Sequence, residues 1–174
     1  MKSYFENLLN EWSMVLLSPE LLFDEKSKDG GYAGIITLIF FSIFLGLISG
    51  ILSKSFVVFI VVAIFLIIFT IVFNIVQTIF IYIFSRLLGG EGSFKSTFNL
   101  LGYLSVIDIF TLIGLSLTSI GNLIIIPISM LVLLWKAVLV VILVNSEFKI
   151  GLGKSFLSSF GILALILICL MGVL

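Results

Sequence analysis

The longest stretch of the chain without a charge runs from Ser55 to Ser85, 31 residues that also contain no glycine and no proline. As a helix it would measure about 46 Å, whereas the hydrocarbon core of a bilayer is about 30 Å thick. The stretch is nevertheless too short to cross a bilayer twice. It therefore predicts one long transmembrane helix that is tilted or projects into the interface.

The composition of the whole chain also indicates a protein that lies in a membrane. Of the 174 residues, 61% are hydrophobic and 10% are charged, and the mean hydropathy is +1.42. An average soluble domain has about 25% charged residues. These values predict an all-α, polytopic integral membrane bundle that has the lipid bilayer as its partner. Five apolar segments are long enough to cross the bilayer, at about 31–53, 55–87, 97–118, 122–145 and 154–174.

The basic residues outside the spans predict the orientation, because cytoplasmic loops carry an excess of Lys and Arg. If the N-terminus is cytoplasmic, Lys54 alone lies outside and seven basic residues lie inside. The chain is therefore expected to be N-in and C-out. The seven inner residues are Lys2, Lys26, Lys28, Arg86, Lys95, Lys149 and Lys154.

Residues 1–30 differ from the spans and are expected to form a cytoplasmic amphipathic segment. Before Pro19, polar residues alternate with apolar residues that recur at helical spacing and so share one face of a helix. The apolar residues are Phe5, Leu8, Leu9, Trp12, Val15 and Leu16. Two uses of this helix stay open, packing under the bundle and binding a partner or sensing curvature. The segment has six acidic residues and no central apolar block, unlike a secretory signal peptide, so we expect it to remain on the chain.

Two charges lie deep inside the spans, away from their ends: Asp108 in the middle of the third and Lys136 well inside the fourth. Either charge alone would cost about 2.5–3.5 kcal/mol on insertion scales, so each needs a partner. The connection between the two spans is short, which makes them antiparallel neighbours. Asp108 is 12 residues before its centre near Ile120, and Lys136 is 16 residues after it. Because side chains tilt toward the N-terminus of their helix, these offsets converge, and we predict an Asp108–Lys136 ion pair.

Further polar residues lie at a similar depth. Asn74 and Gln77 share one stripe of the second span, and Ser105 lies one turn before Asp108. Three interpretations of this intramembrane polar network remain open: interhelical hydrogen bonds that hold the bundle together, a proton or ion path, and a switchable partner site. Impaired assembly of Asp108→Asn would favour the first, and retained folding with lost flux would favour the second.

Small residues in the first span, Gly46 and Gly50, form a GxxxG spacing that lets another helix approach closely. The approaching helix is expected to belong to the same chain, with dimerisation as the alternative. A homo-oligomer is therefore left open.

Several function classes lack the residues they need. The chain has no histidine and a single cysteine, Cys169, inside an apolar run, so the usual metal and disulfide frameworks have no ligands. We expect no metal, no other cofactor and no enzymatic activity. Nine basic and nine acidic residues cancel, which gives no field that would attract nucleic acid.

A polar stretch between the second and third spans is expected to be a cytoplasmic turn. Gly89, Gly90 and Gly92 can take positive φ and end the long helix, while Ser93 or Ser96 can cap the next one.

The order of these residues also resembles a known family. Residues 87–105, LLGGEGSFKSTFNLLGYLS, are called here the signature segment. They resemble the central signature of the Yip family of Ypt/Rab-interacting membrane proteins, in which a Gly-Gly turn and Ser-Phe-Lys precede a helix with Gly-Tyr. The corresponding residues are Gly89, Gly90, Ser93, Phe94, Lys95, Gly102 and Tyr103.

A second stretch resembles the family in prokaryotic members. WSMVLLSPELLF at 12–23 is similar to their Trp-to-Ser-Pro entry. Family members commonly have a proline about four residues after the tyrosine of Gly-Tyr, where this chain has Ile107.

The resemblance implies a Yip-like five-helix transmembrane domain over 31–174. It also implies a non-enzymatic role in membrane organisation or partner recruitment at the cytoplasmic face, with Rab-type GTPases as partners in eukaryotic relatives. The location would be the cell membrane of a prokaryote or an endomembrane of a eukaryote. The alternative, from the residues themselves, is a small permease or an ion or proton pathway that uses the Asp108 and Lys136 layer.

Overall fold

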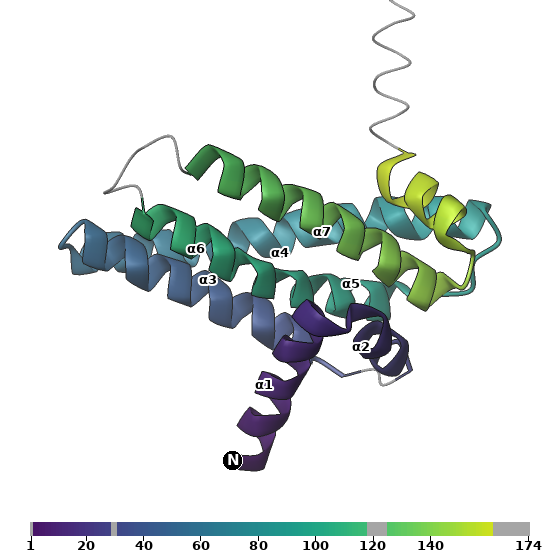
Figure 1. The fold of residues 1–174 in the computed structure, drawn as a ribbon, viewed down its shortest axis with the longest axis horizontal. Coiled ribbons are helices and arrows are strands. Elements are labelled where there is room, and N and C mark those ends of the chain that lie inside the picture. Colours follow the sequence, from purple (N-terminus) through teal and green to yellow (C-terminus); the bar gives the residue numbers. More distant parts are fainter. Residues whose placement is uncertain (1, 29–30, 118–124, 162–174) are drawn as a thin grey trace, which may run out of the picture.

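The computed structural model describes residues 2–28, 31–117 and 125–161, and all regular elements in these ranges are helices (Figure 1). The prediction of an all-α fold is confirmed. The elements, in chain order, are α1 (Lys2–Leu17), α2 (Pro19–Lys26), α3 (Ala33–Leu52), α4 (Phe56–Leu87), α5 (Phe94–Tyr103), the 3-10 helix η1 (Leu104–Ile107), α6 (Asp108–Leu117) and α7 (Ile125–Phe148).

Helices α3 and α4 form a close hairpin. Its turn has Lys54 at φ 52°, and the hydroxyl of Ser55 caps α4 by accepting a hydrogen bond from Val58 N at 3.3 Å. A Cβ atom on Gly46 would lie 2.6 Å from Ala63 Cβ, and one on Gly50 would lie 2.5 Å from the Cβ of Phe59. Both glycines of the GxxxG spacing thus face α4 of the same chain, because only glycine allows the two backbones to approach this closely.

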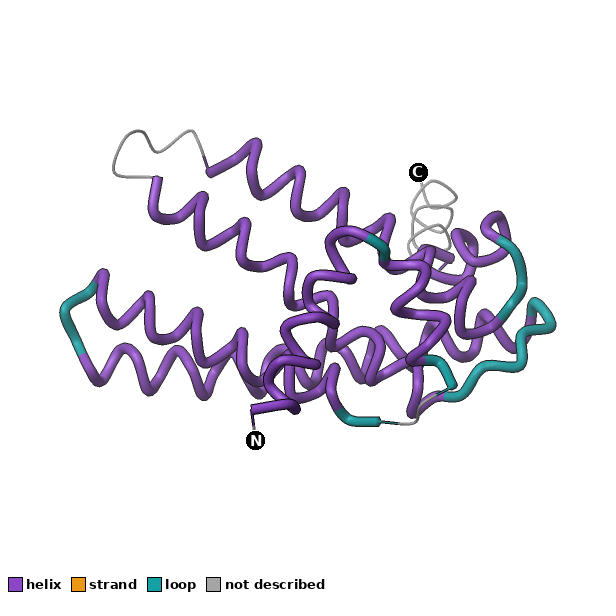
Figure 2. The backbone as a smooth tube through the Cα atoms, turned by 60° about the horizontal axis from the view of Figure 1, so that its bottom comes forward, coloured by secondary structure: helices purple, strands orange, loops and turns teal. Residues whose placement is uncertain are grey.

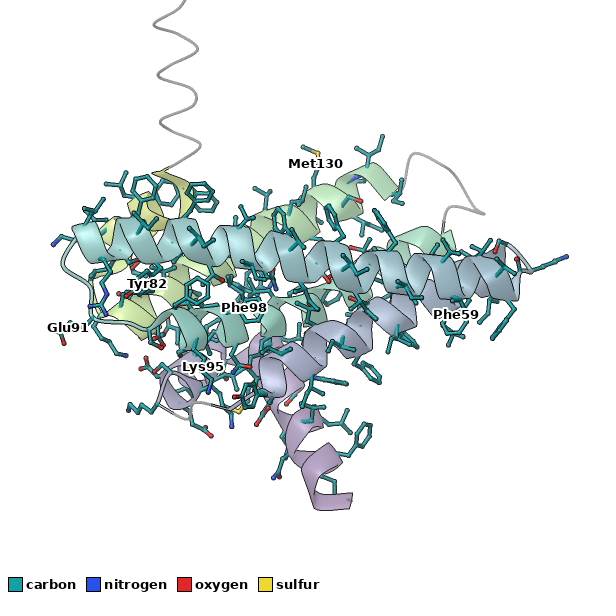
Figure 3. The ribbon with its side chains drawn as sticks, turned by 180° about the vertical axis from the view of Figure 1, so that it is seen from behind. Phe59, Tyr82, Glu91, Lys95, Phe98 and Met130 are labelled. Carbon is teal, nitrogen blue, oxygen red and sulfur yellow. The ribbon has the colours of Figure 1, made fainter. Side chains whose placement is uncertain are left out.

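The long helix predicted from the uncharged run is present. Helix α4 is unbroken over 32 residues, or about 48 Å. Most of its surface is exposed, and the rings of Phe65, Phe69 and Phe73 stack along one exposed stripe. Apolar side chains project outward from α4 along its length in Figure 3. Such a surface suits a helix that faces lipid.

The third expected span is present as a helical stretch, Phe94–Gly114, with a 3-10 turn inside it that the sequence did not indicate. The chain passes through α5, a 3-10 turn in η1 and then α6. Residues 104–107 contain no proline or glycine, so packing must account for the break. Helix α5 lies directly against α3, where a Cβ atom on Gly102 would collide with the carbonyl oxygen of Gly34. The turn coincides with Ile107, the position at which Yip proteins commonly carry proline.

Four helical stretches of the described residues are long and apolar enough to cross a membrane: Ala33–Leu52, Phe56–Leu87, Phe94–Gly114 and Ile125–Phe148. They correspond to the first four expected spans. After α7 the chain turns at Lys149 (φ 55°) and Gly151 (φ 83°) and is helical again from 152 to 161. The rest of the fifth expected span, 162–174, lies outside the described residues.

The N-terminal segment folds into two helices separated at Ser18 by Pro19, which occupies the first turn of α2. Helix α1 runs across the long axis of the bundle (Figure 1). Its Trp12 packs on Phe40 and Phe41, and the indole N–H donates to Thr37 Oγ1 at 2.8 Å. The part of the predicted amphipathic face that meets the bundle is thereby buried.

The core lies toward one end of the bundle. It joins α2, α5 and α7 through buried residues such as Phe23, Leu100, Tyr103, Leu139 and Phe148. The connection between α3 and α4 is at the opposite end of the molecule from the connections that follow α4 and α7 (Figure 2). The two ends of the bundle are therefore built differently.

Candidate functional site

A cavity lies between α4 and α7, with η1, the first residue of α6, Leu101 of α5 and Phe160 also in its lining. It is called here the polar cavity because charged, amide and hydroxyl side chains interrupt its otherwise apolar lining. Lys136 lies in the middle of α7 and Asp108 is the first residue of α6. Lys136 Nζ lies 2.6 Å from Asp108 Oδ1, so the expected ion pair is formed. The Asp108 and Lys136 side chains remain 22% and 29% exposed, and both line a cavity of about 250 Å³.

The same cavity brings together the other polar residues of the predicted intramembrane network. Asn74 and Gln77 reach it from α4, and Ser105 reaches it from η1. Within the described part of the chain, the side chains of Asn74 and Gln77 have no hydrogen-bond partner, and no fully buried polar side-chain atom is unpaired. The amides must therefore be exposed toward the cavity. One carboxylate, one ammonium and two amides from three different helices therefore line the same cavity.

The end of α4 forms a second polar cluster. Gly89 has φ 89° and ends the helix, as expected. Gly90 and Gly92 do not have positive φ, contrary to the expectation for them. They are small because Phe148 of α7 packs against them: a Cβ atom on either glycine would lie 2.8 Å from an atom of its side chain.

Glu147 holds the start of α5, and sequence reasoning missed this role. Its carboxylate accepts hydrogen bonds from Ser93 N at 2.7 Å and from Ser96 Oγ at 2.6 Å. Ser93 is itself the N-cap, since its hydroxyl accepts from Ser96 N. A carboxylate at a helix N-terminus also interacts favourably with the helix dipole. No local pattern signals the contact, because Glu147 is 54 residues from Ser93.

Phe94 and Lys95 lie on the surface of this cluster. The Phe94 ring packs edge-on against Tyr82 at 6.1 Å between centroids, and Lys95 Nζ lies 4.6 Å from the centre of the Tyr32 ring. Lys95, Tyr82 and the exposed Glu91 are at the same end of the molecule in Figure 3. Within the signature segment, Glu91, Phe94 and Lys95 have exposed side chains that other molecules can reach.

Tyr103, the second residue of the Gly-Tyr pair in the signature segment, anchors the N-terminal helices. Tyr103 is fully buried, and its hydroxyl donates to Glu11 Oε2 of α1 at 2.7 Å. Lys26 of α2 pairs with the other oxygen of Glu11 at 2.8 Å. Glu11 and Lys26 were not predicted as site residues, although Glu11 lies on the polar side of the helical pattern.

An exposed ion pair joins α2 to the end of α7. Lys149 Nζ lies 2.6 Å from Asp24 Oδ1, with both side chains more than half exposed. The hydrogen bond from Lys149 lowers the pKa of the Asp24 carboxyl below its ordinary value. This contact ties the N-terminal segment to the loop that follows α7.

The exposed apolar stripe, the four candidate spans and the charges paired between helices define a multi-pass helical membrane protein. Comparison with known families supplies the narrower assignment. The model of the Yip1 domain matches residues 13–174, so the chain belongs to the Yip family. No curated protein and no solved structure shows significant similarity to it.

Proposed function

We propose that this Yip-family protein is a non-enzymatic scaffold that organises the membrane or recruits a protein partner at the cytoplasmic face. The face comprises α1, α2, the turn from Gly89 to Ser96 and the loop from Asn145 to Lys154. The chain has no histidine, and the carboxylate of Glu147 is already engaged with Ser93 and Ser96. These observations favour a binding role for this face over a catalytic one.

One observation carries the proposal: α1 is anchored on one side and apolar on the other. Trp12 and Glu11 hold it to the bundle, while Phe5 and Leu9 are 52% and 44% exposed. Trp12 contacts Phe40, seven residues into α3, or about two turns from its start. A helix held crosswise at that depth suits the boundary between headgroups and acyl chains.

We infer a topology of five spans that is N-in and C-out. Its support is the distribution of basic residues, seven on the inner side against Lys54 on the outer side. Arg86 and Lys154 reach backbone carbonyls around the turn after α4: Arg86 Nη1 donates to Gly90 O at 3.3 Å and Lys154 Nζ to Leu88 O at 3.4 Å. Labelling of single cysteines at Glu91 and Lys54 from either side of the membrane tests this topology.

Photo-crosslinking tests the recruitment role. A photoreactive residue in place of Glu91, which is exposed, should yield a discrete protein adduct in cells. The matched control is the same residue in place of Lys54, exposed at the opposite end. Replacing Phe5 and Leu9 by glutamate should weaken the Glu91 adduct if α1 contributes to the face. Equal adducts from Glu91 and Lys54, or none from Glu91, would count against the proposal.

A second candidate is a small permease, and the observation that favours it is the polar cavity around Asp108. Its lining residues on α4 extend only from Thr70 to Gln77, or about 10 Å of a helix about 48 Å long. This limited extent suits a binding recess better than a continuous path. Ion or proton flux into reconstituted liposomes, lost in a folded Asp108→Asn variant, would establish the permease and reject the scaffold role as the sole function.

A further inference from the structure

The side-chain amides of Asn74 and Gln77 in the polar cavity form no hydrogen bond with the described residues. Each amide offers donors and an acceptor. A polar group left unpaired at membrane depth is strongly unfavourable, because no bulk water is present there. A guest in the cavity that hydrogen-bonds to both amides would remove this penalty.

The remaining part of the last expected span has few side chains that could pair with these amides. Residues 162–174 contain no Ser, Thr, Asn or Gln and no charged residue, and Cys169 is their only side chain with a polar hydrogen. A thiol is a weak donor and a weak acceptor. Residues 162–174 therefore offer no strong side-chain partner, and the two amides have none among the described residues.

The charged side chains of Lys136 and Asp108, which line the same cavity, indicate which chemical groups a bound molecule would carry. Lys136 and Asp108 are both partly exposed, so each keeps hydrogen-bonding capacity beyond the bond it makes to the other. An ammonium and amide N–H groups donate to a phosphate, whereas a carboxylate accepts from an amine. The site is neutral in sum, which matches a guest that carries one charge of each sign.

The shape of the cavity indicates where the guest enters. Two of its lining residues, Phe73 on α4 and Leu133 on α7, are 57% and 67% exposed, and α4 and α7 contact each other at few positions. In the described part of the chain, the cavity therefore opens sideways between α4 and α7, beside Phe160 of the helical stretch 152–161. The cavity lies in the middle part of α4, away from both ends of the helix.

We propose that the cavity binds the headgroup of a membrane phospholipid that carries both a phosphate and an amine, as in phosphatidylethanolamine. The phosphate accepts from Lys136 and the amides of Asn74 and Gln77, and the amine donates to Asp108. The acyl chains leave through the lateral mouth past Phe73 and Leu133. This site does not depend on the role of the cytoplasmic face.

Lipid retention by the purified full chain tests the proposal. The protein is equilibrated with phosphatidylethanolamine, phosphatidylglycerol and diacylglycerol in equal amounts, and the retained lipid is counted by native mass spectrometry. We expect phosphatidylethanolamine to exceed diacylglycerol, which lacks the phosphate and amine, by about tenfold. Phosphatidylglycerol, which has the phosphate without the amine, should fall between them. Equal retention of all three lipids would overturn the proposal.

A variant with both amides removed provides the matched comparison. Asn74→Leu/Gln77→Leu keeps the ion pair and similar volumes, and it should reduce the preference for phosphatidylethanolamine about tenfold. The control Val72→Ala/Ile79→Ala changes two exposed residues on another face of α4 and should keep the preference. An unchanged preference in the amide variant would overturn the proposal. Should that variant fail to fold, the wild-type comparison of the three lipids still decides.

Competition distinguishes the lipid from a water-soluble source of the same group. Glycerophosphoethanolamine has the phosphate and the amine but no acyl chains. We expect it to displace bound phosphatidylethanolamine only at a large excess, because the lipid also gains apolar contacts at the mouth. Displacement at equal concentration would identify an aqueous solute as the guest and would reject the membrane lipid.

Discussion

The Asp108–Lys136 pair allows a quantitative test of how charge is accommodated in the bundle. Removing one partner of a fully buried pair typically costs about 3–5 kcal/mol, whereas an exposed pair contributes about 0–1 kcal/mol. The side chains here lie between these limits, at 22% and 29% exposure. We therefore expect either Asp108→Asn or Lys136→Met to lower the free energy of unfolding by about 2 kcal/mol.

The double variant separates the interaction energy between Asp108 and Lys136 from the effect of each substitution on its other neighbours. Asp108→Asn/Lys136→Met leaves no uncompensated charge, so its loss should be smaller than the sum of the single losses by about 1–2 kcal/mol. Unfolding in mixed micelles of increasing SDS content, followed by tryptophan fluorescence, gives the four free energies that the cycle needs. All four proteins should also be checked for the same helical content before unfolding.

An exposed pair of the same length in the same protein serves as the control. Lys149 and Asp24 are also 2.6 Å apart, but they are 61% and 53% exposed. Their cycle, with Lys149→Met and Asp24→Asn, should give a coupling below about 0.5 kcal/mol. Equal couplings in the two cycles, or additive losses at Asp108 and Lys136, would refute the reasoning that burial in the bundle sets the strength of the pair.

Three further predictions concern the packing of the helices. Tyr103→Phe removes the hydroxyl that donates to Glu11; it should cost about 1 kcal/mol and speed proteolysis within α1, and an unchanged cleavage rate would contradict the anchoring role. Gly46→Leu should destabilise the α3–α4 hairpin by about 1–3 kcal/mol in SDS unfolding, because even a Cβ atom there is too close to α4; Leu47→Ala, on the exposed side, should cost less. The hydrogen bond from Lys149 lowers the pKa of Asp24 in the folded state, so the stability that this bond contributes is present above the unfolded pKa and is lost as pH falls through the folded pKa. Measurements of the unfolding free energy against pH should show a change below about 1 kcal/mol, and the change should be absent in Lys149→Met.

The ion pair could be predicted from sequence because it depends on local geometry. A short connection fixes two antiparallel neighbours, and the direction of side chains on a helix then decides which residues meet. The shared face of Asn74 and Gln77 follows from their spacing in the same way. The spacing does not predict that this face of α4 points toward Asp108 and Lys136. The cavity itself could therefore be found only in three dimensions.

Other features have no local pattern to reveal them. The break at 104–107 occurs in an apolar run without a breaker, and it accompanies close packing of α5 on α3 at Gly34 and Gly102. Glu147 looks isolated in sequence, because its partners are more than 50 residues away. The glycines after α4 were expected to supply turn geometry, but two of them supply space for Phe148. Tertiary packing decided each of these cases.

The contacts of the signature segment separate two kinds of position within one motif. Gly102 packs against a backbone, Tyr103 is buried against α1, and Ser93 caps α5. Substitutions at these positions should act through folding, and their effects on function should follow the loss of stability. Glu91 and Lys95 are exposed, so substitutions there should leave stability within about 0.5 kcal/mol. A functional loss at Glu91 or Lys95 without a loss of stability would therefore locate the recognition surface, which the fold alone does not require.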